Sequence, residues 1–234
     1  MPEYAVEPIQ MTSAAELVSD RLRRLIVTGV LSAGEPLRET QLAKRMEISR
    51  NSLREGIRLL EQSRLVKYEL HRGAVVTTPS VADLADVFRT RRHIELAAVR
   101  VEASDEQLAT LSEACERLEA TAAGLEPDQI IAADLALHQA IVGLLRSERL
   151  SAFYDTICKE LIFYFAVLSH TDEEYLHPQE AIVDRHREIV DALVSRRTSD
   201  AEALLLKHID ENESRLRDIL TVRADASEPA ARRQ

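Results

Sequence analysis

The sequence predicts a mainly α-helical protein with a small β-hairpin in its first third. Apolar residues recur at three- and four-residue spacing through most of the 234 residues, which is the period of an amphipathic helix. Aromatic residues make up only 4% of the chain and glycine only 6 residues, while Ala, Leu, Arg and Glu are abundant. This composition favours helix over strand.

The first third predicts three helices followed by two short strands, the order of a winged helix-turn-helix. Ser13 and Glu16 form a capping box at the first helix, and Ser49 caps the third. The Val- and Thr-rich segments that follow meet at Leu70–Gly73, as in a hairpin. The expected helices are 13–28, 39–46 and 50–62, and the expected strands are 65–69 and 74–78.

The remainder predicts an antiparallel all-α bundle of about six helices after a TTPS linker at residues 77–80. The expected helices lie near 81–103, 105–123, 127–145, 148–169, 178–197 and 199–221. We therefore expect a flexible N-terminus at 1–11, a winged helix-turn-helix domain at 12–79, a helical domain at 80–222 and a disordered tail at 223–234.

The net charge of −10 is unevenly distributed. Residues 1–80 carry 12 basic and 10 acidic side chains, whereas residues 81–234 carry 18 and 30. The first domain can therefore offer a local basic surface to nucleic acid, although the whole chain is acidic. No apolar run is long enough to cross a bilayer. Two cysteines in helical segments suggest buried thiols and a reducing cytoplasm.

The third predicted helix is a candidate for reading DNA. Leu53, Ile57 and Leu60 mark one apolar face, and Arg50, Arg54 and Arg58 recur every four residues on another. An arginine fork can bind phosphate or the guanine edge with two hydrogen bonds. Such a helix contacts bases chiefly through its N-terminal residues. The proposed contacts are Arg50, Asn51, Ser52 and Arg54, with Arg72 and Gly73 at the hairpin tip.

The alternative is an ordinary solvated face, in which these arginines pair with Glu47, Glu55 or Glu61. The winged-helix context favours the DNA-reading interpretation over this one.

The segment DLALHQAIV places Asp134 and His138 on one helical face within apolar surroundings. His186 and His208 also lie beside apolar stripes, on two later helices. One aspartate and three histidines from three helices can make a metal site. Zinc, nickel, copper, iron and manganese are compatible with these donors. The alternatives are structural histidines and a local Asp–His ion pair.

The first domain contains the pattern G-x-L-x-x-G-x-x-L from Gly29, then LRETQLAKRMEISRNSLREGIRLLEQSRLV, then HRGAVV. With these segments it resembles the GntR family of bacterial transcription regulators. It implies a homodimer on palindromic double-stranded operator DNA, and it adds Arg38 to the DNA-contacting residues. The usual S-R-T-P-V-R-E-A-L pattern differs here, with Asn51-Ser52 for Thr-Pro and Gly56 for Ala. Gly56 suggests a less rigid helix. Ser63-Arg64 replaces an acidic residue followed by Gly.

Residues 81–221 resemble the FCD effector domain of the FadR subfamily, and six helices suggest its VanR-like group. The D-x-x-x-H, H-x-x-I and H-[IL] motifs appear as Asp134–His138, His186–Ile189 and His208–Ile209. The resemblance implies a divalent metal on Asp134, His138, His186 and His208, with zinc favoured. Arg92, assigned with Glu95 to an R-x-x-[LI]-E pattern, becomes a candidate to bind an effector carboxylate. An ion pair between Arg92 and Glu95 is the alternative.

Three functions follow from these motifs. The favoured one is a cytoplasmic, ligand-responsive transcription regulator, expected to be a repressor, whose metal-containing domain senses a small carboxylic acid. The second is a metal-dependent hydrolase, although no H-E-x-x-H motif or other general-base motif is present. The third is a helical dimerisation module with structural histidines.

Overall fold

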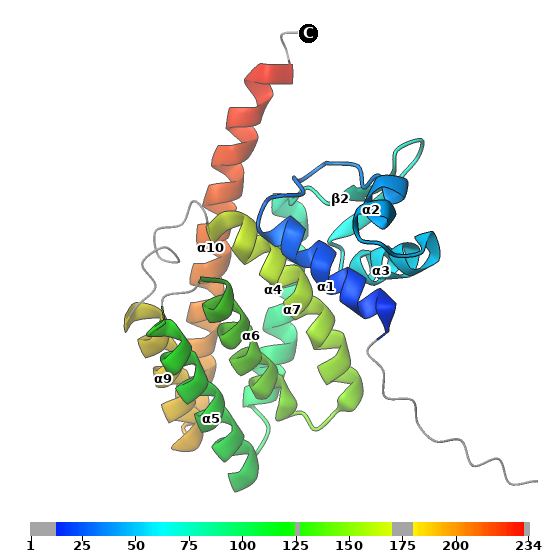
Figure 1. Cartoon of the computed structure of the whole chain (residues 1–234). Helices are drawn as coiled ribbons and strands as arrows, with labels where there is room; N and C mark the ends of the chain where they lie inside the picture. The colour runs from blue at the N-terminus through cyan, green and yellow to red at the C-terminus, as the bar shows by residue number, and fades with distance from the viewer. Residues whose placement is uncertain (1–12, 125–126, 170–179, 232–234) are drawn as a thin grey trace, which may run out of the picture. The chain divides into compact units, whose positions relative to one another are not determined.

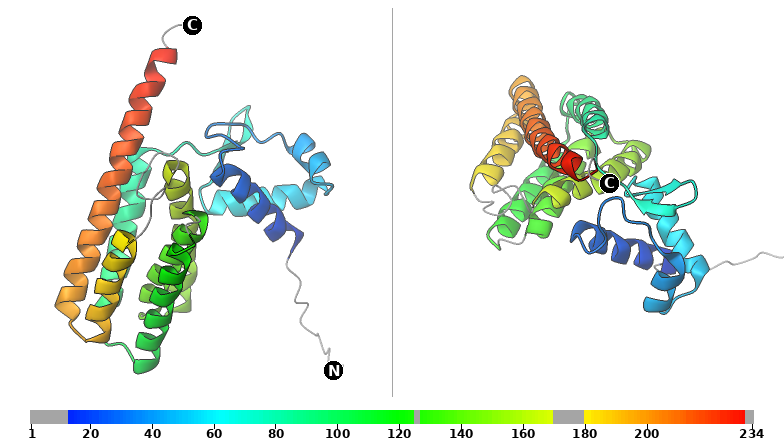
Figure 2. Two further views of the ribbon diagram at one scale, coloured as in Figure 1. Left: turned by 60° about the vertical axis from the view of Figure 1, so that its left-hand side comes forward. Right: turned by 90° about the horizontal axis from the view of Figure 1, so that it is seen from above.

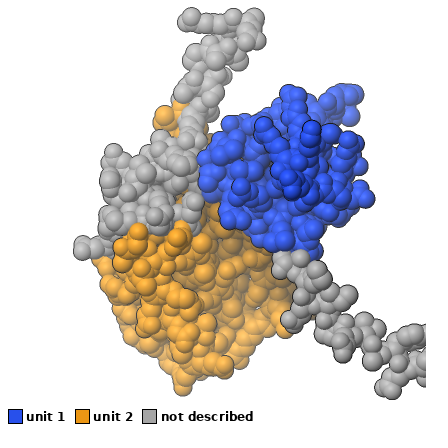
Figure 3. Space-filling model, in the orientation of Figure 1, with its two compact units in different colours: residues 1–77 blue, residues 78–234 orange. Residues whose placement is uncertain are grey.

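The computed structural model describes residues 13–124, 127–169 and 180–231. The chain forms two compact units, residues 1–77 and 78–234 (Figure 3). The predicted flexible segment 1–11 lies outside the described residues. In the described ranges, no helix is both long and apolar enough to span a membrane.

The first unit contains three helices and an antiparallel hairpin (Figure 1). Its elements are α1 (Ala14–Val27), α2 (Glu39–Arg45), α3 (Arg50–Gln62), β1 (Val66–Glu69) and β2 (Gly73–Val76). In the hairpin, Val66 pairs with Val76 and Glu69 with Gly73. The predicted capping box between Ser13 and Glu16 is formed. The winged helix-turn-helix order predicted from the sequence is confirmed.

Helices α1 and α3 pack against each other at close range. Leu22 of α1 and Leu53 and Ile57 of α3 are fully buried in this unit. A Cβ added at Gly56 would lie only 2.5 Å from Val18 Cγ1. Gly56 therefore permits a close contact between two helices, a role that its low helix propensity alone does not reveal.

The second unit is a bundle in which six helices are described, as predicted (Figure 2). They are α4 (Val81–Val99), α5 (Asp105–Ala122), α6 (Pro127–Gly143), α7 (Glu148–Ser169), α9 (Glu180–Val194) and α10 (Thr198–Ala231). Helix α10 packs against α4 and α9, while α6 packs against α4, α5 and α7. Leu84, Phe88, Tyr154, Phe165 and Leu205 are fully buried in the shared core.

Helix α10 is longer than the sequence analysis predicted, because it runs to Ala231 rather than ending near residue 221. The expected tail at 223–234 thus begins within the helical residues 223–231, and residues 232–234 lie outside the described ranges. Four alanines occur among residues 223–231. Alanine has the highest helix propensity, and extending an existing helix requires no new nucleation.

Candidate metal centre

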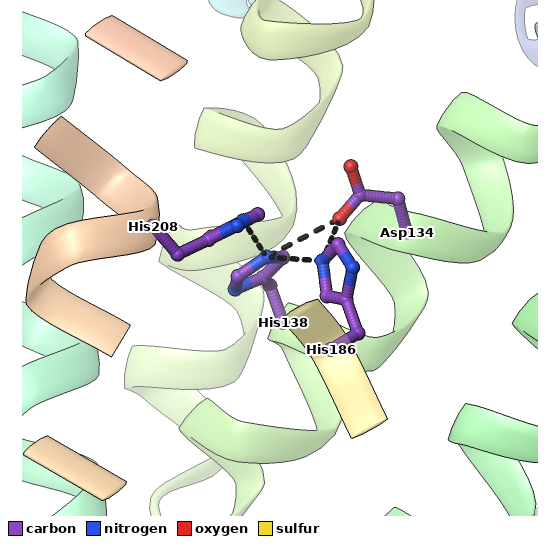
Figure 4. Close-up of side chains that lie close together, drawn as sticks. All are labelled: Asp134, His138, His186 and His208. Atoms are coloured by element: carbon purple, nitrogen blue, oxygen red, sulfur yellow. Dashed lines mark hydrogen bonds and ion pairs between the residues drawn. The ribbon is translucent and has the colours of Figure 1, made fainter. Parts of the chain in front are cut away.

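Four side chains predicted as metal ligands come together inside the second unit (Figure 4). Asp134 and His138 lie one turn apart on α6, His186 projects from α9 and His208 from α10. All four are buried, with between 0% and 4% of each residue exposed. The helical periodicity that places them beside apolar stripes also turns them toward the bundle core.

The four groups converge on His138 Nε2. This atom lies 3.2 Å from Asp134 Oδ1, 3.2 Å from His208 Nε2 and 3.3 Å from His186 Nε2. Asp134 Oδ1 also lies 2.9 Å from His186 Nε2. In a tetrahedral zinc site with bonds of about 2.0–2.1 Å, neighbouring ligand atoms lie about 3.3 Å apart. These four separations are close to that value, and all four ligand atoms lie within 4.8 Å of one another.

The outer nitrogens of two histidines indicate where their protons lie. His138 Nδ1 is 2.6 Å from Glu95 Oε2, and His186 Nδ1 is 2.7 Å from the carbonyl oxygen of Ile182. Both oxygens accept hydrogen bonds, so each Nδ1 donates and each Nε2 presents a lone pair to the cluster. Asp134 Oδ1 is buried, and it has no hydrogen bond of acceptable geometry although both Nε2 atoms lie within ion-pairing distance.

His208 presents its Nε2 lone pair to the cluster as well. Arg215 donates to Asn212 Oδ1 at 2.9 Å, which turns Asn212 Nδ2 toward His208 Nε2 at 3.1 Å. Because the amide nitrogen is a donor, His208 Nε2 is the acceptor. On this assignment all three Nε2 atoms are unprotonated and lie beside one carboxylate oxygen, and the Nε2 of His208 accepts a hydrogen bond from the Asn212 amide. A cation is the chemical group that satisfies this donor set.

The electrostatics of the cluster also favour a cation. Burial alone would raise the pKa of Asp134, but His186 and His138 lower it well below its usual value. Burial and the neighbouring His186 and His138 lower the pKa of His208 well below its usual value. The pKa of His138 is raised, since Glu95 and Asp134 outweigh burial and Arg91. A cationic proton or metal is therefore attracted to the centre of the cluster.

Arg92, the predicted effector-binding residue, pairs with acidic residues of α10 rather than with the four candidate ligands. Its Nε donates to Asp210 Oδ1 of α10 at 2.7 Å, and its Nη2 donates to Glu213 of the same helix. The alternative of an ion pair with Glu95 is also wrong. An R-x-x-I-E spacing requires an arginine four residues before Glu95, and that residue is Arg91. One residue along a helix rotates the side chain by about 100°, so Arg91 and Arg92 face different surroundings.

Arg91 is fully buried and was not predicted as a site residue. Its Nε donates to Glu95 Oε1 at 2.6 Å, while both of its terminal nitrogens are buried without a hydrogen-bond partner. Unpaired buried guanidinium N–H groups are unfavourable and call for an acceptor. Tyr154 and Asn212 are not predicted from the sequence either, and Glu95 is predicted only as a partner of Arg92. The available signal was the R-x-x-I-E spacing, which identifies Arg91 and Glu95.

The predicted DNA-contacting residues of the first unit lie at the start of two helices and on the hairpin. Arg38, Arg50 and Asn51 are exposed, and within the described ranges neither Arg38 nor Arg50 has an acidic partner. Arg54 pairs with Glu39 of α2 at 2.7 Å. Among the acidic residues expected to pair with the arginines of α3, Glu55 pairs with Arg58 at 2.8 Å. Two arginines therefore remain available to an external anion.

Ser52 and the hairpin residues have local roles as well. The backbone N–H of Ser52 donates to the Ser49 hydroxyl at 3.0 Å, which caps α3. At the hairpin, Arg72 donates to Gly34 O at 2.8 Å and also pairs with Glu69. Gly73 has a φ of +73° and open space where a side chain would be. This conformation suits glycine and leaves the hairpin backbone accessible.

Comparison with known proteins identifies both units. Residues 86–211, more than half of the chain, match the FCD domain, and residues 14–76 match the bacterial regulatory proteins of the gntR family. The chain belongs to the GntR family of bacterial transcription regulators. The relatives of this GntR-family regulator are named as regulators and repressors, not as enzymes.

Three comparisons extend over most of the GntR-family regulator. YdhC, an uncharacterized HTH-type transcriptional regulator of Bacillus subtilis, is 28% identical over 205 residues, covering 86% of this chain and 90% of YdhC. The gluconate operon transcriptional repressor of Bacillus licheniformis is 24% identical, covering 89% and 86% of the two chains. A solved GntR-type structure from Rhodococcus sp. RHA1 is 27% identical with a TM-score of 0.75, covering 88% and 98%.

Proposed function

We propose that this regulator is a repressor that binds a palindromic operator as a homodimer and senses a small carboxylate beside a metal in its FCD domain. The observation that carries the proposal is the convergence of three buried imidazole nitrogens and one carboxylate oxygen within 4.8 Å of one another. Zinc is favoured by the ligand set, with nickel, manganese and iron as alternatives. The regulator would act in the cytoplasm, where its operator is.

Asp134, His138, His186 and His208 would hold the metal, and a bound metal would supply positive charge that attracts an anionic effector. Arg91 supports the choice of a carboxylate, because its two terminal nitrogens are buried and unpaired. A carboxylate can accept from both nitrogens in a bidentate contact. We therefore assign the effector contact to Arg91 instead of Arg92, whose guanidinium pairs with Asp210 and Glu213.

Effector binding would act on DNA through a coupling free energy between the two units. Arg50, Asn51, Ser52 and Arg54 of α3 would contact the major groove, with Arg38 at the start of α2. Arg72 and Gly73 of the hairpin would approach the backbone or minor groove. Two relatives are named as repressors, of the gluconate operon and, as a probable repressor, of a D-xylose utilization operon. These names support repression as the mode of action.

The test is metal analysis of the full chain purified without chelator. We expect about one divalent metal per chain, lost on Asp134→Ala or His208→Ala and kept on His93→Ala, since His93 is exposed on α4. Metal-loaded protein is then titrated onto operator DNA with a panel of small carboxylates. Substoichiometric metal that does not increase on reconstitution would refute the metal site. Metal-loaded protein that responds to no carboxylate would refute the effector class alone.

A further inference from the structure

Glu95 lies behind the candidate metal centre and joins three helices. It belongs to α4 and is fully buried. His138 Nδ1 of α6 lies 2.6 Å from its Oε2, Arg91 Nε of α4 donates to its Oε1 at 2.6 Å, and the Tyr154 hydroxyl of α7 donates to the same oxygen. Both carboxylate oxygens of Glu95 therefore have hydrogen-bond partners, and these contacts fix the position of the side chain.

This arrangement determines which nitrogen of His138 carries the proton. An ionised carboxylate only accepts hydrogen bonds, so the nitrogen facing it must be N–H. The Nε2 of the neutral ring is then unprotonated and points at Asp134, His186 and His208. A histidine ligand that donates its other N–H to a carboxylate is oriented and made more basic by that contact.

The three histidines differ in this respect. His186 donates Nδ1–H to the backbone carbonyl of Ile182, which no side-chain substitution removes. His208 Nδ1 is buried without a hydrogen-bond partner. Within the described ranges, the contact from His138 to Glu95 is thus the one in which a carboxylate side chain fixes the tautomer of a candidate ligand.

We infer that Glu95 is a positioning residue that fixes His138 as an Nε2 ligand, and that Tyr154 and Arg91 hold Glu95 in place for this purpose. The inference rests on the proposed metal site and goes beyond it, because it assigns metal affinity to a residue that does not touch the metal. The glutamine variant keeps the size of the side chain but can offer an N–H in place of an oxygen.

The first experiment measures Zn²⁺ affinity of the full chain by competition with a chelator. We expect Glu95→Gln to bind Zn²⁺ about 10- to 100-fold more weakly than wild type. Glu213→Gln is the matched control, because Glu213 is a buried carboxylate of the same bundle that pairs with Arg92 and Arg217. It should bind Zn²⁺ like wild type. An unchanged affinity of Glu95→Gln would overturn the inference, as would an equal loss in both variants.

The second experiment determines which ring nitrogen of His138 carries the proton, by ¹⁵N NMR of metal-free protein at pH 8. We expect the Nδ1–H form in wild type and in Glu213→Gln, and a mixture of both tautomers in Glu95→Gln. Tyr154→Phe, which removes one hydrogen bond from Glu95, provides a milder variant if Glu95→Gln fails to fold, with an affinity loss of less than about tenfold. A wild-type protein in the Nε2–H form would contradict the inference even if metal binds.

These two measurements also separate the inference from the function on which it depends. Absence of Zn²⁺ binding in wild type would refute the metal site, whereas the tautomer of His138 can be measured without any metal. Normal Zn²⁺ binding by folded Glu95→Gln would be consistent with the metal site and would refute only the positioning role of Glu95.

Discussion

Gly56 of α3 faces Val18 of α1 so closely that a Cβ at position 56 would lie 2.5 Å from Val18 Cγ1 and 2.8 Å from Val18 Cβ. Helix propensity alone predicts that Gly56→Ala stabilises the protein by about 1 kcal/mol. Overpacking a helix contact costs about 1–3 kcal/mol, and the short, branched Val18 cannot turn away. We expect Gly56→Ala to lower the free energy of unfolding by about 1 kcal/mol in urea titrations.

The same contact can be tested by a double-mutant cycle with Val18→Ala, which removes the nearer of the two carbons. The penalty of Gly56→Ala should shrink in that background. Equal penalties in both backgrounds would show that the contact between α1 and α3 does not limit residue 56.

Arg64 ends α3 in a conformation that favours glycine. Its φ is +54°, Leu65 N–H donates to Leu60 O at 3.0 Å and Arg64 N–H donates to Glu61 O at 2.9 Å. This is the Schellman pattern, with Arg64 at the left-handed position. We expect Arg64→Gly to raise the free energy of unfolding by up to about 1 kcal/mol. Glycine removes the strain of the left-handed conformation from the folded state. It also makes the unfolded chain more flexible, which lowers stability, but by less than the strain that is removed. A lower urea midpoint would contradict this expectation.

Loss of operator binding on Arg50→Ala tests the DNA-reading assignment. Arg50 is exposed at the first turn of α3 and has no acidic partner in the described ranges, so it is free to bind a base or phosphate. We expect operator affinity to fall about tenfold or more at fixed salt, with metal content unchanged. Arg58→Ala removes the same charge from the last half of α3 and should have a smaller effect.

Arg54→Ala should weaken operator binding less than Arg50→Ala. The Arg54 guanidinium is paired with Glu39, and that hydrogen bond raises its pKa. DNA must therefore replace an existing partner at this position, which offsets part of the gain. Fluorescence anisotropy with labelled operator at several salt concentrations checks both arginines, and equal losses would show that Glu39 does not compete.

Removal of the metal should lower thermal stability. Its four candidate ligands lie on α6, α9 and α10, so a metal that binds only the folded chain stabilises it by about 4 kcal/mol at a concentration 1,000 times Kd. We expect chelator to lower the Tm of wild type by several degrees and to leave Asp134→Ala unchanged. A wild-type Tm that is insensitive to chelator, in protein shown to release its metal, would argue against coupling of the site to folding.

Arg91 and Arg92 form a matched pair for testing the effector contact. Both are arginines of α4, but Arg91 is buried with unpaired nitrogens whereas Arg92 pairs with Asp210 and Glu213. We expect Arg91→Gln to abolish the response of operator binding to a carboxylate, and Arg92→Gln to retain it with lower stability. The reverse result would restore the assignment made from the sequence.

Local sequence was sufficient to predict most of the fold. Ser13, Ser49 and Ser104 each cap the helix that follows, because capping depends on side chains within three residues. The end of α10 was missed, because its last residues carry no helix-ending signal other than Pro229, which lies two residues before its C-terminus.

The site was predicted only in part, because convergence is a property of the packed bundle. The spacing from Asp134 to His138 predicts one helical face, but nothing local shows that His186 and His208 meet it. The assignment of Arg92 has a different origin. The R-x-x-I-E spacing in the sequence selects Arg91, and the structure adds that Arg91 is buried whereas Arg92 is partly exposed.

The order of the ligands along the chain has a consequence for biosynthesis. The DNA-reading unit ends at Thr77, whereas the last proposed ligand is His208 of α10. Translation proceeds at about 5–20 residues per second, so on the order of ten seconds separate the emergence of these two positions. A nascent chain therefore exposes a complete DNA-reading unit well before it can capture its metal.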